Sequence, residues 1–170
     1  MAVTDTSIAA ATDLLGQRLE KCSAARECVW ALTDAAIGIF ALPDCVAYLL
    51  NDDGQTLTQV SGFGPKMKLP QLLENAITLR IGQGIVGHVA AARRLIRIDD
   101  TRVDARYVLD DDQRLSELAI PIQHNDTLFG VLDMEHAERA FYDAQHERVL
   151  THMAALTAAR IDALRTFGRN

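Results

Sequence analysis

Apolar and small residues recur every seven positions through the first quarter of the chain, and a second apolar stripe runs beside them. The members of the two stripes are Ile8, Leu15, Cys22, Val29 and Ala36, with Leu19, Leu32, Ile39 and Phe40 alongside. A period near 3.5 residues is typical of a helix that buries one face. The pattern therefore predicts one long amphipathic helix that begins near residues 4–7 and ends before Pro43.

Two pairs of alternating apolar segments, each joined by a polar turn, predict two β-hairpins at 45–64 and 115–136. Between the hairpins we expect a weakly helical connection at 65–76, a short helix after a glycine turn and a short strand at 95–99. A final helix is predicted from a cap at Asp143 to about Phe167, where Gly168 ends it.

Hairpins make antiparallel strand pairs, so this order of elements predicts an α+β fold with both terminal helices on one face of a sheet. The chain shows no linker, internal repeat or low-complexity segment. We expect one domain over residues 1–170, in which residues 1–13 form either a flexible start or an extension of the first helix into a dimer.

Three glycines in the order Gly82-x-Gly84-x-x-Gly87 resemble the fingerprint of a dinucleotide-binding fold. That fold requires a parallel strand–helix–strand unit of about 30 residues and an acidic residue about 20 positions further on. Here the apolar run at 85–92 gives barely two helical turns, and the acidic pair at 99–100 comes too early. The glycines are better explained by a tight turn and a close backbone approach.

Composition and charge narrow the function classes. The net charge of −6 and the absence of a basic patch with interleaved aromatic residues argue against nucleic-acid binding. No signal peptide and no apolar run long enough to span a bilayer are visible, so we expect a cytoplasmic protein without a membrane partner. The three cysteines, Cys22, Cys28 and Cys45, have no metal-binding spacing and are expected to be small buried hydrophobes.

Four segments in succession resemble the signatures of a GAF domain. They are "IGQGIVGHVAAARRLIRIDD", "DARY", "RLSELAIPI" and "LFGVLDMEHAERAFYDAQHERVLTHMA". The resemblance covers residues 14–164 and is closest to GAF modules of bacterial sensor kinases and cyclases. It implies a central antiparallel sheet of about six strands, a pocket roofed by the short helices and loops, and a role in small-molecule sensing, signal transduction or dimerisation.

GAF domains differ in what fills the pocket. Members that bind cyclic nucleotides carry an Asn-Lys pair after the last strand and an acidic pair four residues after an aromatic. Here 133–136 holds no Asn-Lys, and although Phe141 matches the aromatic, Gln145-His146 stands where the acidic pair should be. Members that bind bilins attach them to a cysteine in the second half, but no cysteine follows Cys45.

An enzymatic type, free methionine-(R)-sulfoxide reductase, is more distantly similar through its "SEI-x-VP" and "GVLD-x-D" motifs. The resemblance gives Glu117, Asp133 and Glu135 the role of holding an ammonium group. Val86 and Asp110 stand where the family has its catalytic thiols, and sulfoxide reduction needs thiols. We therefore expect no enzymatic activity, with a divergent reductase and a purely structural dimerisation module as the alternatives.

The sequence thus predicts a GAF sensor domain that binds an unknown small ligand, one with an amine group, and dimerises through its terminal helices. No cofactor or metal ion is expected, because the histidines and the aspartate-rich loop match no metal-binding motif. The carboxylates could instead lie on the solvated side of the sheet. The candidate pocket residues are Glu117, Asp133, Glu135, Tyr107, Arg106, His88 and Ser116.

Overall fold

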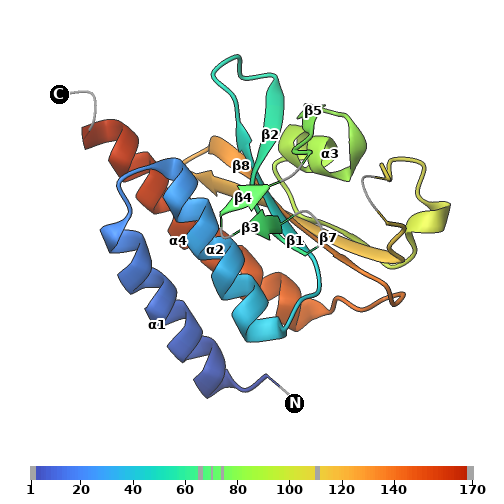
Figure 1. Cartoon of the computed structure of the whole chain (residues 1–170), viewed down its shortest axis with the longest axis horizontal. Coiled ribbons are helices and arrows are strands. Elements are labelled where there is room, and N and C mark those ends of the chain that lie inside the picture. The colour runs from blue at the N-terminus through green and yellow to red at the C-terminus, as the bar shows by residue number, and fades with distance from the viewer. Residues whose placement is uncertain (1–2, 65–66, 70, 74, 110–111, 168–170) are drawn as a thin grey trace.

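The computed structural model describes residues 3–64, 67–69, 71–73, 75–109 and 112–167. The helices and strands follow in the order α1 (Asp5–Lys21), α2 (Ala25–Phe40), β1 (Cys45–Leu50), β2 (Thr56–Phe63), β3 (Met67–Leu69), β4 (Leu72–Leu73), β5 (Thr78–Arg80), α3 (Gly84–Ala92), β6 (Ile96–Ile98), a 3-10 turn (Thr101–Val103), β7 (Ser116–His124), β8 (Thr127–His136) and α4 (Ala144–Phe167) (Figure 1). None of the helices described here combines the length and the apolar character needed to cross a membrane.

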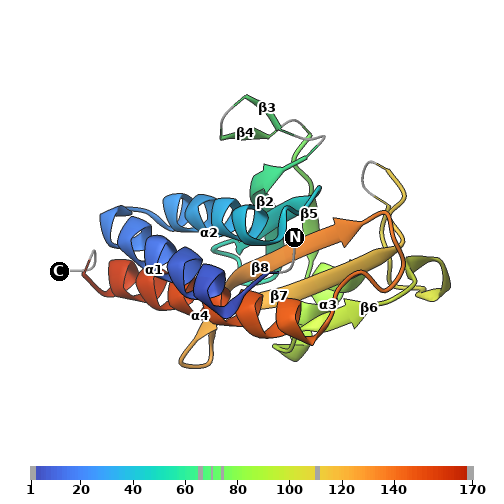
Figure 2. The ribbon, with the colours of Figure 1, turned by 90° about the horizontal axis from the view of Figure 1, so that it is seen from below.

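The core of the fold is a six-stranded sheet in the order β5-β2-β1-β8-β7-β6, in which every neighbouring pair is antiparallel. Helices α2 and α4 pack on one face of this sheet, and α1 packs on α2 and α4 as an outer layer (Figure 2). Helix α3 packs on β7 and β8 from the other face. The predicted α+β, GAF-like architecture is confirmed.

The long first helix predicted from the apolar stripe is wrong, because the chain breaks it into α1 and α2. The backbone of Cys22 is extended, with a ψ of 138°, and α2 begins only at Ala25, after the extended cap residue Ala24. The amide and hydroxyl of Ser23 both donate to the carboxylate of Glu27, at 2.7 and 3.1 Å. The chain reverses direction between α1 and α2. Apolar residues of both helices nevertheless pack in the same core, which explains why the seven-residue period continues across the break.

Residues 65–76 were predicted to form a weakly helical connection, and this prediction is wrong for the residues that the structure describes. The described residues of this stretch form the small hairpin of β3 and β4, and Gln71 and Asn75 have positive φ angles that interrupt a helix. Strand β5 was not predicted, since three residues carry too short an alternation to recognise. It pairs with Thr56–Thr58 of β2 and completes one edge of the sheet.

Both predicted hairpins and the last helix are confirmed. Asn125 and Asp126 have φ angles of 45° and 61° in the turn between β7 and β8, as a tight antiparallel hairpin requires. The carboxylate of Asp143 accepts hydrogen bonds from the amides of Gln145 and His146 at 2.9 and 3.0 Å, so it caps α4. The predicted stop at Gly168 lies outside the described residues.

The glycine turn brings α3 close to the sheet. Gly82 and Gly84 have φ angles of 86° and 67°, which side chains disfavour. A Cβ atom on Gly87 would stand 2.4 Å from the carbonyl oxygen of Arg80. The glycines therefore serve a turn and a close backbone approach, as the sequence predicted.

Replacing Gly87 with alanine should lower the free energy of unfolding by about 2 kcal/mol or more, because the new methyl group meets the backbone. Gly16 of α1 is the matched control. It has open space around its Cβ position, so Gly16→Ala should stabilise the protein by about 0.5–1 kcal/mol. Urea unfolding of both variants measures this, and equal effects of the same sign would show that the close approach at Gly87 is unimportant.

Candidate functional site

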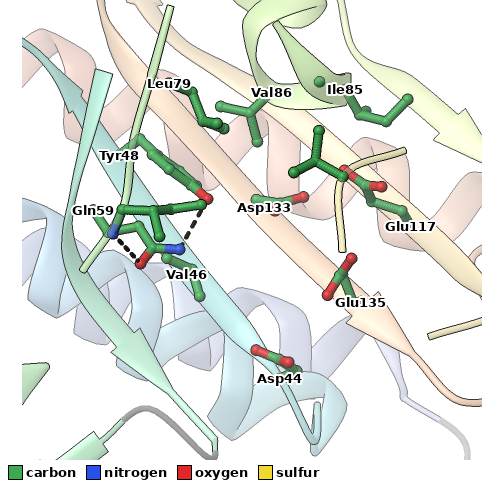
Figure 3. A pocket seen from close by; sticks show the side chains of 13 residues that line it. Asp44, Val46, Tyr48, Gln59, Leu79, Ile85, Val86, Glu117, Asp133 and Glu135 are labelled. Atoms are coloured by element: carbon green, nitrogen blue, oxygen red, sulfur yellow. Dashed lines mark hydrogen bonds between the residues drawn. The ribbon is translucent and has the colours of Figure 1, made fainter. Parts of the chain in front are cut away.

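A cavity of about 40 Å³ lies between α3 and the sheet face that α3 covers. Its polar end is formed by four acidic residues, which we call the carboxyl cluster: Asp44, Glu117, Asp133 and Glu135. Its walls are formed by Val46, Tyr48, Gln59, Ile77, Leu79, Gly84, Ile85, Val86 and Val108 (Figure 3). The volume is enough for a few water molecules or for one small polar group.

Strand geometry places the carboxyl cluster on one side of the sheet. Glu117 of β7 is paired directly opposite Glu135 of β8, and Asp133 is two residues before Glu135. Side chains two apart on a strand share a face, and in Figure 3 these three carboxyl groups point into the same space. Glu117 is only 3% exposed, so it does not lie on a solvated face.

Burial and mutual repulsion change the acidity of the two glutamates. Burial raises the pKa of Glu117 to about 8, and the facing charge of Glu135 adds to the rise. Burial likewise raises the pKa of Glu135 to about 9, together with the charges of Asp133 and Asp44. Two groups oppose the second shift, namely the Tyr107 hydroxyl, which hydrogen-bonds Glu135, and the guanidinium of Arg114. Both shifts favour the protonated form of these carboxyl groups.

Two members of the polar end were missed by the sequence analysis. Asp44, directly before β1, forms a buried ion pair at 3.3 Å with Arg114, two residues before β7. The two residues are seventy positions apart, and neither lies within a strand whose alternation could have assigned it a face. Asp44 belongs to the carboxyl cluster, and Arg114 supplies positive charge beside it.

The opposite wall combines an apolar surface with one amide. Gln59 of β2 donates to the hydroxyl of Tyr48 at 2.9 Å and accepts from the amide of Ile77 at 3.1 Å (Figure 3). Leu79 and Val86 complete this side of the cavity. A bound molecule would thus meet carboxyl groups at one end and a mostly apolar wall at the other.

The remaining predicted residues lie around the cavity rather than in its lining. Tyr107 contacts the carboxyl cluster through its hydrogen bond to Glu135. Arg106 is held by two hydrogen bonds to Asp104, at 2.9 and 2.7 Å, and its charge acts on Glu117 from that position.

His88 and Ser116 have local partners. The Nδ1 atom of His88 lies 2.6 Å from the carbonyl oxygen of Gly84, one turn earlier in α3. The hydroxyl of Ser116 donates to the carbonyl of Glu138 at 2.7 Å, because Ser116 points to the other face of the sheet from its neighbour Glu117. Neither side chain lines the cavity.

The cysteines and the cavity lie on opposite sides of the sheet. Cys22, Cys28 and Cys45 are buried in the core between the sheet and α1, α2 and α4, whereas Val86 lines the cavity. Asp110 lies outside the described residues. Within the described part of the chain, no three His, Cys, Asp or Glu side chains are arranged to hold a metal ion.

Comparison with known proteins adds three kinds of similarity. A family model of the GAF domain matches residues 22–162. Free methionine-R-sulfoxide reductase of Escherichia coli is 25% identical over 108 residues, which cover 64% of this chain. Protein YtsP of Bacillus subtilis is 27% identical over 103 residues, which cover 61% of this chain. The matched stretches span only 58% of YtsP and 59% of the reductase.

Two solved structures resemble the whole chain. Free methionine-R-sulfoxide reductase of Neisseria meningitidis has a TM-score of 0.82 at 15% identity, with 98% of this chain and 96% of that chain covered. The GAF domain of an Acinetobacter phosphoenolpyruvate-protein phosphotransferase has a TM-score of 0.80 at 14% identity, with 96% of each chain covered. At such low identity these structures establish a common fold and no more.

Replacing Arg114 with methionine should lower the free energy of unfolding by about 3 kcal/mol at pH 8, because Asp44 keeps a buried charge without its partner. A buried carboxylate without its partner relieves its charge by taking up a proton, so the loss should be smaller at pH 5, where protons are more available to Asp44. The control is Arg94→Met at an exposed position. Urea unfolding at both pH values checks the prediction, and an equal loss at pH 5 and pH 8 would contradict it.

Proposed function

Because the chain belongs to the GAF domain family, we propose that it is a regulatory domain that senses a small cationic ligand in the cavity beneath α3. The observation that carries this proposal is the grouping of four carboxyl groups around one space, two on buried residues (Asp44 and Glu117) and two on half-buried ones (Asp133 and Glu135), with the guanidinium of Arg114 paired to Asp44. An ammonium or guanidinium ligand supplies the positive charge that such a group of carboxylates favours.

The empty site destabilises the folded protein when its carboxyl groups are ionised. Carboxyl groups that face one another in a buried place repel when ionised, and the raised pKa values of Glu117 and Glu135 measure that repulsion together with burial. A cation that enters the cavity relieves the repulsion and gains charge-assisted hydrogen bonds. The apolar wall around Leu79 and Val86 suits a short hydrocarbon group attached to that cation.

The second candidate function is sulfoxide reduction, which the similarity to the Escherichia coli reductase favours. The positions of the thiols favour regulation instead. Cys45 is fully buried on the helix side of the sheet, and burial raises its pKa well above the usual range. A thiol with such a pKa is a poor nucleophile. Turnover of free methionine sulfoxide with NADPH, thioredoxin reductase and thioredoxin distinguishes the two functions, and regulation predicts none.

The chain is also proposed to form a homodimer through its terminal helices, as regulatory domains that transmit a signal between subunits require. Most of the apolar stripe of α1 is buried within the chain, so the remaining support is the groove between α1 and α2. That groove is lined mainly by Ala10, Ala11, Leu14, Ala35 and Ile39, and Leu14 is 56% exposed there.

In sedimentation equilibrium, the wild-type chain should behave as a dimer that dissociates on dilution. Leu14→Lys should shift it to the monomer, because a charge placed in an apolar contact loses its hydration. Val103→Lys is the control, since Val103 is 83% exposed in a loop away from these helices. A wild-type monomer at all concentrations, or a dimer insensitive to Leu14→Lys, would rule out this surface.

The ligand proposal predicts that small amines or guanidines raise the melting temperature, whereas neutral amides of the same shape do not. A ligand at 100 times its Kd adds about 2.7 kcal/mol to the free energy of unfolding. Glu117→Gln should weaken binding at least about tenfold, because a charge-assisted hydrogen bond is lost, and it should leave the apo protein as stable as before or more so.

The matched control for this test is Asp52→Asn, which removes a carboxylate from the exposed turn after β1. It should change neither binding nor stability. If Glu117→Gln instead destabilises the apo fold by several kcal/mol, Glu117 is a structural anchor. The absence of any stabilising cation from a panel of amines, guanidines and amino acids would overturn the proposal.

A further inference from the structure

We infer that a cation enters this cavity in exchange for a proton held by the carboxyl cluster, so that occupancy depends on pH as well as on ligand concentration. The inference rests on the proposed cation site and concerns its regulation. It follows from the number, burial and hydrogen bonding of the charged groups that face the cavity.

The first support is the placement of three carboxyl groups around one cavity. Glu117 pairs directly with Glu135 across β7 and β8, and Asp133 lies two residues before Glu135 on the same face. Glu117 is only 3% exposed. An ionised carboxylate only accepts hydrogen bonds, so facing carboxyl groups bond to one another only when one of them carries a proton. This placement favours a proton retained in the empty site.

The second support is the imbalance of charge around the cavity. Among the described residues, the titratable and charged groups that line the cavity or act on its carboxyl groups are Asp44, Cys45, Tyr48, Asp104, Arg106, Tyr107, Arg114, Glu117, Asp133, Glu135 and Tyr142, with His88 acting on Asp104. The acidic groups outnumber the two arginines. Arg106 is already bonded to Asp104, and Arg114 to Asp44.

Neither arginine is therefore available to neutralise Glu117 and Glu135 completely, and a buried excess of negative charge is relieved by proton uptake. The pKa of about 8 for Glu117 and about 9 for Glu135, set first by burial and then by the neighbouring carboxylates, agrees with such uptake. The tyrosine hydroxyl that hydrogen-bonds Glu135 keeps a donor in place whether this carboxyl is charged or neutral.

The exchange is balanced in charge and in protons. The empty site holds a proton on the facing glutamates, and an incoming monovalent cation stabilises the ionised form of that carboxyl group. The proton then leaves to solvent, and the cation takes its place as the positive charge of the site. No oxidant, reductant or covalent step is involved. Binding should thus be weak in acid and strengthen as the pH rises toward 9.

The experiment has one arm without ligand. Urea unfolding of the apo protein from pH 5 to pH 9 measures the retained protons, because the folded-state pKa values exceed those of the unfolded chain. The stability should be greatest near the ordinary glutamate pKa and should fall as the pH rises through about 8 and 9. Glu117→Gln should flatten this fall, whereas Asp52→Asn should keep it.

The second arm is calorimetry with methylguanidinium, which keeps its charge throughout this pH range, and with methylurea as its neutral analogue. Titrations at pH 7 in phosphate and in Tris give the number of protons released, which should approach one. The Kd for methylguanidinium should fall about tenfold per pH unit from pH 6 to pH 8. It should then level off near pH 9.

Each outcome decides a different claim. An apo stability that stays level or increases from pH 6 to pH 9 overturns the retained proton, whatever binds. Binding of methylguanidinium without proton release overturns the exchange and leaves the cation site intact. If the apo stability falls as described but methylguanidinium fails to bind even at pH 9, the proposed cation site and the exchange are both overturned.

Discussion

The repulsion between buried Glu117 and half-buried Glu135, which face each other across β7 and β8, is the constraint on which this site depends. Glu117 and Glu135 are a direct cross-strand pair in the central part of the sheet. Like charges in that position destabilise a sheet, and burial increases the cost. The Tyr107 hydroxyl, which hydrogen-bonds Glu135, and the positive charge of Arg114 both favour the ionised form of Glu135 and so oppose the rise in its pKa. The proposed cation would relieve the same repulsion.

The two faces of the sheet carry two separate cores, and the proposed binding site belongs to the smaller one. The core beneath α1, α2 and α4 is large and apolar, and it contains the three cysteines. The smaller core beneath α3 surrounds the cavity, and the glycine turn at 82–87 lets α3 approach closely enough to enclose it. A stable first core allows the second to contain unfavourably placed acidic groups, which is a common division between scaffold and functional site.

The helices and strands with strong local sequence patterns were predicted correctly. The predictions failed where contacts between distant parts of the chain determine the structure. The alternation along β8 was enough to place Asp133 and Glu135 on one face of the sheet. The break between α1 and α2 depends on Ser23 and Glu27, a signal hidden inside an unbroken apolar stripe. Asp44, Gln59 and Arg114 were missed because their roles arise from tertiary contacts, and only the folded sheet brings them to the cavity.

The central claim is that Glu117 and Glu135 are protonated in the empty site and that a cation ionises one of them. Carboxyl ¹³C chemical shifts observe this directly, since each side chain can be assigned by comparing the wild type with Glu117→Gln and Glu135→Gln. At pH 7 both resonances should have the shift of a neutral carboxyl, and saturating methylguanidinium should move one to that of a carboxylate. Two carboxylate shifts in the apo protein, or no change on binding, would contradict the account.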